Sequence, residues 1–492
     1  MNRILLFTDI ISNWRIRPYG AYALANTMRM HNYSTMVVDY LNSFTLSEIE
    51  KIIDKSLDEN SLLVGYSFTF YDNLFGIKVI DLEKFKSINQ YIKKNFPKVK
   101  IIVGGGQSKR FQTELKYQPD NLGVDFIMHG YAESMLPEVC DYLSQGLNPK
   151  FSNIINGVKI IDHDIKASSH DFRNVSHKWH DTDIVQLNEP LSIEVARGCV
   201  FKCKYCSYPL LGKKKNDDSY IKTEEILLAE ILENYERFNT TAYTVLDDTF
   251  NERTDKIELM CRVRDRSKID LSFVGYNRLD LIHRKPEQLP LLRDMNWIGF
   301  NFGIESLNYN SAKVIGKGIK PDDVLKTLRS IKEIYKGNVI IQTNFIFGLP
   351  YDTPATVDEW LKIVLADDFP ADAFAFNPLI FSDSFETSGF MANPSAFGYK
   401  IDPLRRWAWS TENWDFDSAA KLAAQVVSDV QLSPKTRIMP FRIPSAIKLG
   451  FSMDQIFNIS IKDLTKLMLD EQREEKFKKQ YINGLFNKLQ IY

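Results

Sequence analysis

Short apolar runs alternate with helix-like patterns along the first 150 residues of the chain. These stretches follow in the order Arg3–Thr8, Tyr19–His31, Thr35–Asp39, Leu62–Ser67, Ile80–Asn95 and Val99–Val103. Apolar runs separated by amphipathic stretches are typical of βαβ units. Glycines at the predicted strand ends suit ligand binding beyond the carboxyl edge of a parallel sheet. We therefore predict an α/β fold that begins with a doubly wound, Rossmann-like domain at residues 1–150.

A second alternation of the same kind occupies residues 190–385. Its predicted strands are Leu191–Val195, Tyr243–Leu246, Leu271–Val274, Gly299–Gly303, Ile340–Phe347 and Ala373–Asn377. Helical stretches such as Thr223–Phe238 and Asp322–Tyr335 separate them. Six βα repeats predict a partial (β/α)6 TIM-type barrel, whose functional groups gather at the carboxyl ends of its strands.

The other two segments have looser patterns. Residues 151–189 are predicted to be a linker between domains, and residues 386–492 a mainly helical region that caps the barrel. The predicted helices of that region are Asp417–Val430 and Leu464–Leu489, and its tryptophans Trp407, Trp409 and Trp414 are expected to pack in a core rather than line a substrate cavity. The linker holds His163, His170, His177 and His180. Their spacing fits no common ligand pattern, which favours solvated loop histidines over a metal site.

Composition narrows the class of protein. The chain has 492 residues, 44% of them hydrophobic and 25% charged, and a net charge of −1, as in ordinary globular proteins. The absence of a global basic field weighs against nucleic acid as a partner. No apolar run reaches the roughly 18 residues of a membrane span, and the apolar start soon meets Asp9, unlike a signal peptide. We therefore expect a cytoplasmic protein without a membrane partner.

Three of the five cysteines, Cys199, Cys203 and Cys206, stand together directly after a predicted strand. Thiolates are soft ligands for zinc or for iron–sulfur clusters. A structural zinc site needs four ligands. The other two cysteines, Cys140 and Cys261, each stand alone in the sequence and are better interpreted as small buried hydrophobic residues. A cluster with three protein ligands would leave one iron open for another molecule.

Residues 196–206 read Ala-Arg-Gly-Cys-Val-Phe-Lys-Cys-Lys-Tyr-Cys. This loop, with the aromatic Tyr205 before its third cysteine, resembles the signature of the radical S-adenosylmethionine (SAM) superfamily. The resemblance implies that Cys199, Cys203 and Cys206 are catalytic metal ligands of a 4Fe–4S cluster. It further implies that the open iron chelates SAM and that one electron cleaves SAM to a 5′-deoxyadenosyl radical, with Tyr205 near the cofactor.

Polar segments after the later strands extend the resemblance. Asp247, in Asp-Asp-Thr-Phe-Asn, would approach the methionine end of SAM, and Glu305 and Ser306 would contact its ribose and carboxylate. Gly348 opens Gly-Leu-Pro-Tyr-Asp-Thr, which resembles the segment that cradles adenine, although an Asp stands at position 352 where Glu is usual. Arg278 is a candidate for the SAM carboxylate, but an ordinary surface arginine fits the sequence equally well.

A Rossmann-like domain before such a barrel is similar to the cobalamin-binding subclass. The positions that match include Ser67 and the glycine loop Gly104, Gly105 and Gly106, which in that family embrace the nucleotide tail. The chain departs from the family at the motif that supplies an axial histidine, because residues 9–20 contain none. Cobalamin is therefore expected without a protein ligand below it, and a degenerate domain used only for packing is the alternative.

The function predicted from these resemblances is that of a cobalamin-dependent radical SAM methyltransferase acting on an unactivated carbon or phosphorus centre. A radical SAM enzyme that performs rearrangement, cyclisation or epimerisation is the next alternative, and an inert iron–sulfur protein another. Methylthiotransferases fit poorly, because their N-terminal domain carries three cysteines of its own and here only Cys140 is present. The expected partners are a small-molecule or peptide substrate and an electron donor such as flavodoxin or ferredoxin.

Overall fold

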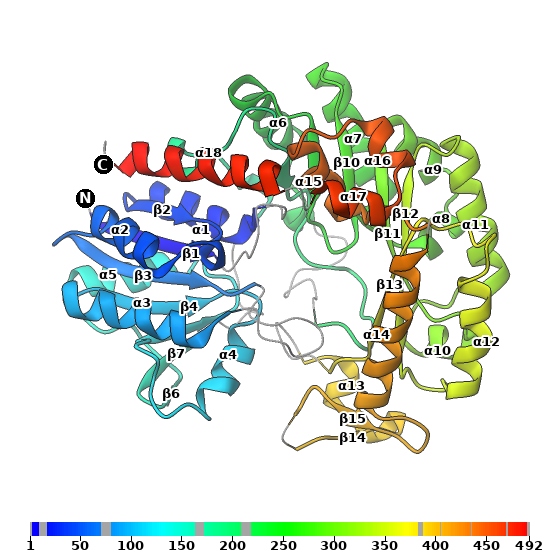
Figure 1. Ribbon diagram of the computed structural model, residues 1–492, viewed down its shortest axis with the longest axis horizontal. Coiled ribbons are helices and arrows are strands. Elements are labelled where there is room, and N and C mark those ends of the chain that lie inside the picture. Colours follow the sequence, from blue (N-terminus) through cyan, green and yellow to red (C-terminus); the bar gives the residue numbers. More distant parts are fainter. Residues whose placement is uncertain are drawn as a thin grey trace. The chain divides into compact units, whose positions relative to one another are not determined.

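The computed structural model describes residues 2–8, 17–69, 80–162, 172–207, 218–381, 387–403, 405–433, 435–468 and 471–489. The chain divides into two compact units (Figure 1). The first unit comprises Met1–Asp171, Ser176–Gln186 and Glu474–Tyr492, and the second comprises Phe172–Val175 and Leu187–Arg473. The described part of the chain contains no helix with the length and apolarity to cross a bilayer.

A seven-stranded sheet forms the centre of the first unit. Its strands lie in the order β2-β1-β3-β4-β5-β7-β6, all parallel except for β6 against β7. Their bounds are β1 Arg3–Thr8, β2 Ser34–Val38, β3 Ser61–Ser67, β4 Lys100–Gly104, β5 Phe126–His129, β6 Asn153–Ile155 and β7 Val158–Asp162. The helices are α1 Tyr19–Met30, α2 Leu46–Ser56, α3 Leu82–Asn95, α4 Ser108–Leu115 and α5 Leu136–Ser144. The predicted doubly wound, Rossmann-like fold is confirmed.

The predicted linker begins inside this sheet. Strands β6 and β7 are a hairpin closed by Asn156 and Gly157, with φ of 46° and 79°. An Asn-Gly pair suits such a two-residue turn because both positions need positive φ, so this signal was present in the sequence. His177, which was expected to be a solvated loop histidine, is buried. Its ring lies 4.6 Å from the ring of Tyr19 and 4.7 Å from that of Trp179. His163 and His170 lie outside the described residues.

The C-terminal helix belongs to the first unit, not to a cap on the barrel. The single helix predicted at Leu464–Leu489 is divided into α17, Ile461–Met468, and α18, Glu471–Leu489. Apolar side chains of α18 complete the core of the first unit: Phe477, Tyr481, Leu485 and Leu489. The hydroxyl of Tyr481 also accepts a hydrogen bond of 2.9 Å from the backbone N–H of Asp39. The charged sequence of α18 hides this narrow apolar stripe.

Arg17 ties distant segments of the first unit together. Its buried guanidinium donates to the carbonyl oxygens of Asp183 at 2.6 Å and Ile184 at 2.7 Å, and to the Tyr22 hydroxyl at 2.8 Å. The carboxylate of Asp39 balances its charge at 3.4 Å. Arg17 therefore fastens residues 183–184 beside α1, which the sequence pattern alone does not reveal.

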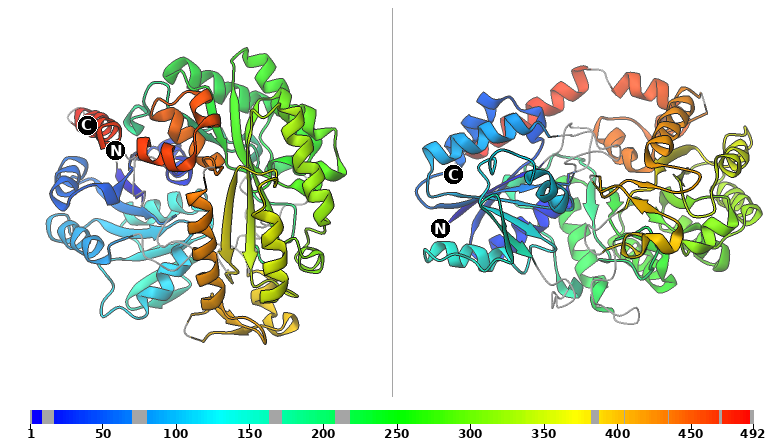
Figure 2. Two further views of the ribbon diagram at one scale, coloured as in Figure 1. Left: turned by 45° about the vertical axis from the view of Figure 1, so that its right-hand side comes forward. Right: turned by 90° about the horizontal axis from the view of Figure 1, so that it is seen from below.

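Six parallel strands in sequence order, β8 to β13, form the sheet of the second unit. They are β8 Leu191–Ile193, β9 Ala242–Val245, β10 Ser272–Asn277, β11 Trp297–Glu305, β12 Ile340–Phe347 and β13 Ala373–Pro378. The helices between them are α6 Glu224–Phe238, α7 Thr254–Ser267, α8 Leu279–Arg284, α9 Gln288–Asp294, α10 Tyr309–Val314, α11 Pro321–Ile334 and α12 Pro354–Val364. Helices α9, α11 and α12 lie along one side of this sheet (Figures 1 and 2). The predicted partial barrel is confirmed.

Later elements pack on this barrel. They are mainly helical: α13 Gly389–Ala392, α14 Phe416–Leu432, α15 Ile443–Lys448, α16 Met453–Asn458 and α17, with a short antiparallel pair, β14 Lys400–Ile401 and β15 Trp409–Ser410. Helix α14 runs beside the edge strand β13 (Figure 1). Trp409 and Trp414 are buried, as core packing predicts.

Candidate functional site

The cysteine loop leaves the carboxyl end of β8. The backbone of Ala196 bridges to Ile221, and the N–H of Arg197 donates to the carbonyl of Tyr220 at 3.0 Å. Gly198 then turns the chain with a φ of 86°, a value that strains residues with a Cβ. The loop thus starts from a fixed backbone position at the strand end.

The three cysteines of the loop are half-buried and are not joined in disulfides. Thr249 places its hydroxyl 3.5 Å from the sulfur of Cys199, and Arg278 donates to the sulfur of Cys203 at 3.4 Å. Burial raises the pKa of Cys199, and the Thr249 hydroxyl acts in the opposite direction. Among the described residues, no three Cys, His, Asp or Glu side chains are grouped as around a single ion. Three thiols are soft donors, and two of them are contacted by a hydroxyl or a guanidinium. This arrangement fits an iron–sulfur cluster.

Arg278 is fixed against this loop and is not a surface arginine, since it is 4% exposed. Its guanidinium donates to both carboxylate oxygens of Asp280, at 2.9 and 3.0 Å, and to the carbonyl of Gly316 at 2.9 Å. It also stacks over the ring of Phe201 at 4.0 Å. The guanidinium therefore places a positive charge at the Cys203 sulfur, and its contact with a SAM carboxylate stays a prediction.

Asp247 holds the start of the cysteine loop in place. One of its oxygens accepts the backbone N–H groups of Val195 and Ala196, both at 2.9 Å, and the other pairs with Lys256 at 3.0 Å. Although burial lowers the pKa of Lys256, the carboxylates of Asp247 and Glu252 outweigh it and raise that pKa. The Asp247 carboxylate is thus occupied in a buried ion pair and two backbone contacts, and its approach to SAM stays a prediction.

The neighbouring Asp248 holds the free carboxylate, which the sequence analysis missed. The residue is exposed, and its carboxylate has no hydrogen bond or ion pair with the described residues. Desolvation by the surrounding protein, together with the charges of Asp247 and Glu194, raises its pKa to about 7. Alternation along a strand could have found it, because Asp248 shares the parity of the exposed Leu246.

Glu305 and Tyr205 meet at the end of β11. The Tyr205 hydroxyl donates to the Glu305 carboxylate at 2.7 Å, and the Lys317 ammonium lies 3.4 Å from the same oxygen. Burial, followed by the Glu305 charge, raises the pKa of Tyr205. Glu305 has a φ of 73°, which a residue with a Cβ adopts only where its surroundings enforce it. Such strain is typical of functional sites.

Ser306 and Gly348 have protein neighbours in the structure, and their cofactor contacts stay predictions. The Ser306 hydroxyl faces the buried carboxyl of Asp352 at 3.5 Å, which also accepts from Ser311 at 2.9 Å. A Cβ on Gly348, where φ is 88°, would overlap the indole of Trp409. The space that this glycine leaves is therefore filled by a protein ring.

The glycine loop of the first unit follows β4, beside Ser67 at the end of β3. Gly105 has a φ of 95°, and a Cβ there would lie 2.8 Å from the backbone of Phe68, so this glycine is required by the loop itself. A Cβ on Gly106 would meet nothing within 4 Å, and one on Gly104 nothing closer than 3.8 Å. Gly104 and Gly106 are thus the two positions at which backbone is left open to a ligand.

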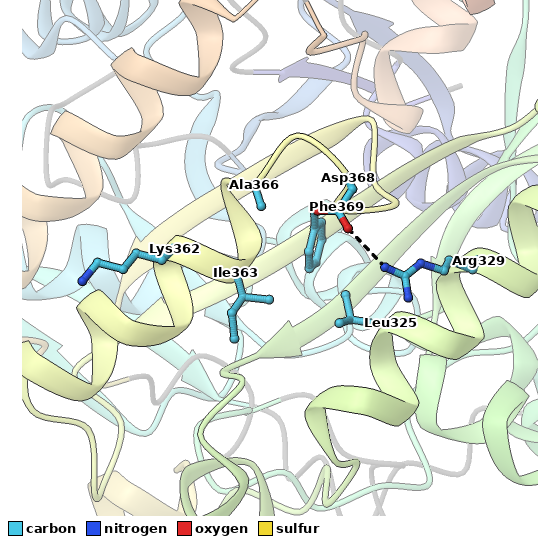
Figure 3. Close-up of a pocket in the computed structure, with 7 residues that line it drawn as sticks. All are labelled: Leu325, Arg329, Lys362, Ile363, Ala366, Asp368 and Phe369. Carbon is cyan, nitrogen blue, oxygen red and sulfur yellow. Dashed lines mark hydrogen bonds and ion pairs between the residues drawn. The ribbon is translucent and has the colours of Figure 1, made fainter.

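A pocket on the opposite side of the barrel offers no comparable chemistry. Figure 3 shows it between α11 and α12, with Arg329 and Asp368 paired at 3.4 Å across one end. Its lining residues are Leu325, Arg329, Lys362, Ile363, Ala366, Asp368 and Phe369. It lies on the helix side of the sheet, away from the strand ends that hold the cysteine loop.

Comparisons with known proteins agree with this geometry. Residues 193–364 match the family model described as Radical SAM superfamily. An uncharacterized methyltransferase of Pyrococcus horikoshii is 24% identical over 70% of this chain and 72% of its own length. The ribosomal protein uS12 methylthiotransferase RimO of Dictyoglomus thermophilum is 22% identical over 62% of this chain and 68% of its own length.

The fold is similar to that of a solved enzyme over most of the chain. The radical SAM methyltransferase TsrM from Kitasatospora setae, with tryptophan substrate and the SAM analog aza-SAM bound, aligns with a TM-score of 0.62 at 16% identity. The alignment covers 82% of this chain and 78% of TsrM. A second structure of TsrM, with cobalamin and a 4Fe–4S cluster bound, aligns with a TM-score of 0.60 at 17% identity, over 82% of this chain and 80% of TsrM. At these identities the likeness shows the fold alone.

Asp352→Asn should change how stability depends on pH. Burial raises the pKa of Asp352 to about 7, and one of its oxygens has no partner. The unfolded chain releases this proton near pH 4, so the folded state loses stability as pH rises from about 4 to about 7, by at most about 4 kcal/mol. The variant should lack this loss and be stabilised relative to wild type above about pH 7. Thermal unfolding across this pH range measures it.

The matched control for that experiment is Asp358→Asn, whose carboxylate is 67% exposed on α12. It should unfold with the pH dependence of the wild type. An Asp352→Asn variant with an unchanged pH dependence would show that this carboxyl is ionised throughout.

Proposed function

Because residues 193–364 form a radical SAM domain, we propose that this protein is a cobalamin-dependent radical SAM methyltransferase. The observation that carries the proposal is the cysteine loop at the end of β8, with a buried cation on one sulfur and the strained Glu305 at the end of β11. Function in such barrels gathers at the strand ends, where these groups stand.

Cys199, Cys203 and Cys206 are the residues that would hold a 4Fe–4S cluster. Such a cluster, with an electron from a donor such as flavodoxin or ferredoxin, supplies the reductive cleavage of SAM to a 5′-deoxyadenosyl radical. The side chains around the cysteines position and stabilise them. Asp247 fixes the start of the loop, and Arg278 donates a hydrogen bond from its positively charged guanidinium to the Cys203 sulfur. That charge favours the thiolate over the thiol.

Two carboxylates are suited to orient SAM. Asp248 is unpaired and exposed, so it can accept hydrogen bonds from an ammonium group. Glu305 is held by Tyr205 and Lys317 through one oxygen, which leaves the other for ribose hydroxyls. The strained backbone at Glu305 fixes the direction of this carboxylate before the ligand arrives.

The first unit is suited to a corrinoid whose methyl group would be transferred to the substrate. The supporting features are the open positions at Gly104 and Gly106 and the neighbouring Ser67, at the carboxyl edge of a parallel sheet. His129 ends β5 nearby, but its ring nitrogens are engaged by Ser108 at 2.9 Å and by Gln112. A corrinoid would therefore bind without a histidine ligand from this position.

Similarity to RimO makes methylthio transfer the second candidate. The first unit holds one cysteine, Cys140, which is fully buried, and burial raises its thiol pKa to about 12. The separate set of three cysteines that a methylthiotransferase needs is missing from the sequence. Methyl transfer is therefore the better-supported proposal.

Replacing Cys199, Cys203 and Cys206 together by Ala should abolish cluster binding, because no other thiol stands in the loop. The measurements after anaerobic reconstitution are iron content, the visible spectrum, and 5′-deoxyadenosine formed from SAM with a chemical reductant. Cys261→Ala is the control and should behave as wild type. Near-wild-type iron in the triple variant, or a wild type that forms no 5′-deoxyadenosine, would contradict the proposal.

Two adjacent substitutions separate SAM binding from support of the loop. Asp248→Asn should weaken SAM binding by about ten- to a hundredfold without loss of stability, because it removes a charged acceptor whose carboxylate has no partner among the described residues. Asp247→Asn should cost about 3 kcal/mol of stability, because it leaves Lys256 with one carboxylate fewer in a buried site. Calorimetric titration with SAM and thermal unfolding measure the two effects. The assignment fails if the two variants exchange these behaviours.

Gly106→Val should abolish corrinoid retention and spare the fold, since its side chain would enter open space. The measurement is anaerobic titration with hydroxocobalamin, desalting, and electron paramagnetic resonance of the reduced cob(II)alamin state. Lys55→Val, at an exposed position of α2, is the control. Gly105→Val is unsuitable because its Cβ would strike the Phe68 backbone. A wild type that retains no corrinoid, or nitrogen splitting from a protein histidine, would favour a domain used only for packing.

A further inference from the structure

The barrel sheet of the second unit has one face toward its helices and one away from them. On β12, Phe345 and Phe347 stack on Trp360 of α12, at 5.2 and 5.7 Å. On β11, Phe300 packs on Tyr335 at the end of α11, at 5.7 Å. Because side chains alternate along a strand, the residues between these aromatics face the other way. We call that second side the inner face.

The inner face carries carboxamides where a barrel interior is ordinarily filled by branched apolar side chains. By this alternation Gln342 and Asn344 of β12 and Asn301 of β11 belong to it. Gln342 donates to the Asn344 carbonyl oxygen at 2.7 Å, and the Asn344 amide donates to the carbonyl oxygen of Asn301. We call these three residues the amide ladder.

The ladder orients Asn344 and leaves it binding capacity. Gln342 and Asn301 are 5% and 3% exposed, whereas Asn344 is half-buried. A carboxamide has two N–H donors and two acceptor positions, and Asn344 uses one of each. One donor and one acceptor therefore remain for another molecule, in a direction set by two buried neighbours.

The ladder has a cost that its packing does not explain. The Gln342 carbonyl oxygen is buried without a partner, and a buried polar atom without a hydrogen bond is destabilising. Asparagine is also disfavoured in strands, and β11 and β12 lie inside the sheet. Local rules are broken in this way chiefly at functional sites.

Register places Asn344 beside the predicted SAM contacts. Asn344 pairs with Gly303 on β11 and with Ala375 on β13. Above Gly303 the Lys317 ammonium donates to its carbonyl at 2.9 Å and lies 3.4 Å from Glu305. Neighbouring strands are about 4.8 Å apart, so a molecule held by Asn344 would be adjacent to the group that Glu305 orients.

Apolar side chains on the same face complete the surroundings. Leu246 and Tyr276 are 37% and 45% exposed, and the Tyr276 ring packs against Phe441 at 4.6 Å. Tyr276 pairs in register with Asn301, which joins this apolar side to the ladder. Apolar walls with a few fixed polar groups are typical of small-molecule sites.

We propose that Asn344 binds the substrate of this enzyme, and that the substrate is uncharged, with a carboxamide or peptide amide beside an apolar ring or chain. Gln342 and Asn301 are positioning residues. This inference rests on the proposed function, because it uses the adjacency to Glu305.

Charge on the inner face argues for a neutral ligand. The ladder offers only uncharged partners, and carboxamides alone compensate poorly for desolvating an ion. The Lys317 cation, which lies beside this face, is already shared with Glu305.

The test is the affinity of benzamide for the full chain, reconstituted anaerobically, by ligand-observed nuclear magnetic resonance. Benzamide should bind, and benzoate about tenfold more weakly or not at all. Asn344→Leu should weaken benzamide binding about fivefold or more, the equivalent of one lost hydrogen bond, and Gln342→Leu should act in the same direction. Absence of benzamide binding, or equal affinity in wild type and Asn344→Leu, overturns the proposal, as does benzoate binding equal to benzamide.

Thr343→Val is the matched control, since Thr343 lies between the two ladder residues but faces the helices, and its buried hydroxyl has no partner. It should fold and bind benzamide as wild type does. Thermal unfolding shows whether each variant is folded. If Asn344→Leu does not fold, the benzamide affinity of Gln342→Leu tests the proposal in its place. Benzamide affinity does not depend on SAM cleavage, so 5′-deoxyadenosine formation in the same samples shows separately whether the proposed function itself fails.

Discussion

The buried pair of Asp247 and Lys256 is the interaction on which the candidate site depends. One Asp247 oxygen accepts two consecutive backbone N–H groups at the end of β8, and the other is balanced by Lys256. A buried carboxylate without that cation would be strongly destabilising. Because Cys199 stands three residues after Ala196, the direction in which the thiols leave the sheet follows from this pair. Asp247 thus supports the loop, whereas its exposed neighbour Asp248 has a carboxylate that is not used in this way.

Glycines at strand ends fall into two groups, those that the fold requires and those that it does not. Gly348 and Gly105 both have positive φ, and both leave room that protein atoms already fill, Trp409 in one case and the Phe68 backbone in the other. Gly106 has neither reason to be glycine. A glycine that neither backbone angle nor packing requires is a stronger sign of a ligand than a glycine in a familiar motif.

Sequence patterns predicted the architecture well because burial imposes them. The bounds of β1 and β12 agree with the predictions, and the order of six βα units follows from alternation alone. The patterns missed contacts between distant segments: α18 in the first unit, the partners of Arg17, and the engagement of Arg278 by Asp280 and Gly316. At the site, the sequence predicts functional roles for Tyr205 and Glu305, and their side chains are hydrogen-bonded to each other in the structure. The sequence does not show which of the adjacent residues Asp247 and Asp248 faces the interior, because a pair of aspartates carries no such signal.

The inner face of the barrel is polar, although polar residues there stabilise the sheet less than apolar ones would. An apolar interior would stabilise the sheet more than Gln342, Asn344 and Asn301 do, since a carboxamide oxygen remains buried without a partner. The strained Glu305 adds a second cost at the carboxyl end of β11, further along the sheet than the paired residues Gln342 and Asn301. The aromatic packing toward the helices on β11 and β12 stays regular. Stability is therefore supplied by the helix side of the sheet, and the inner face is free to keep polar groups in fixed directions. A barrel divided in this way can hold a reactive site without loosening its core.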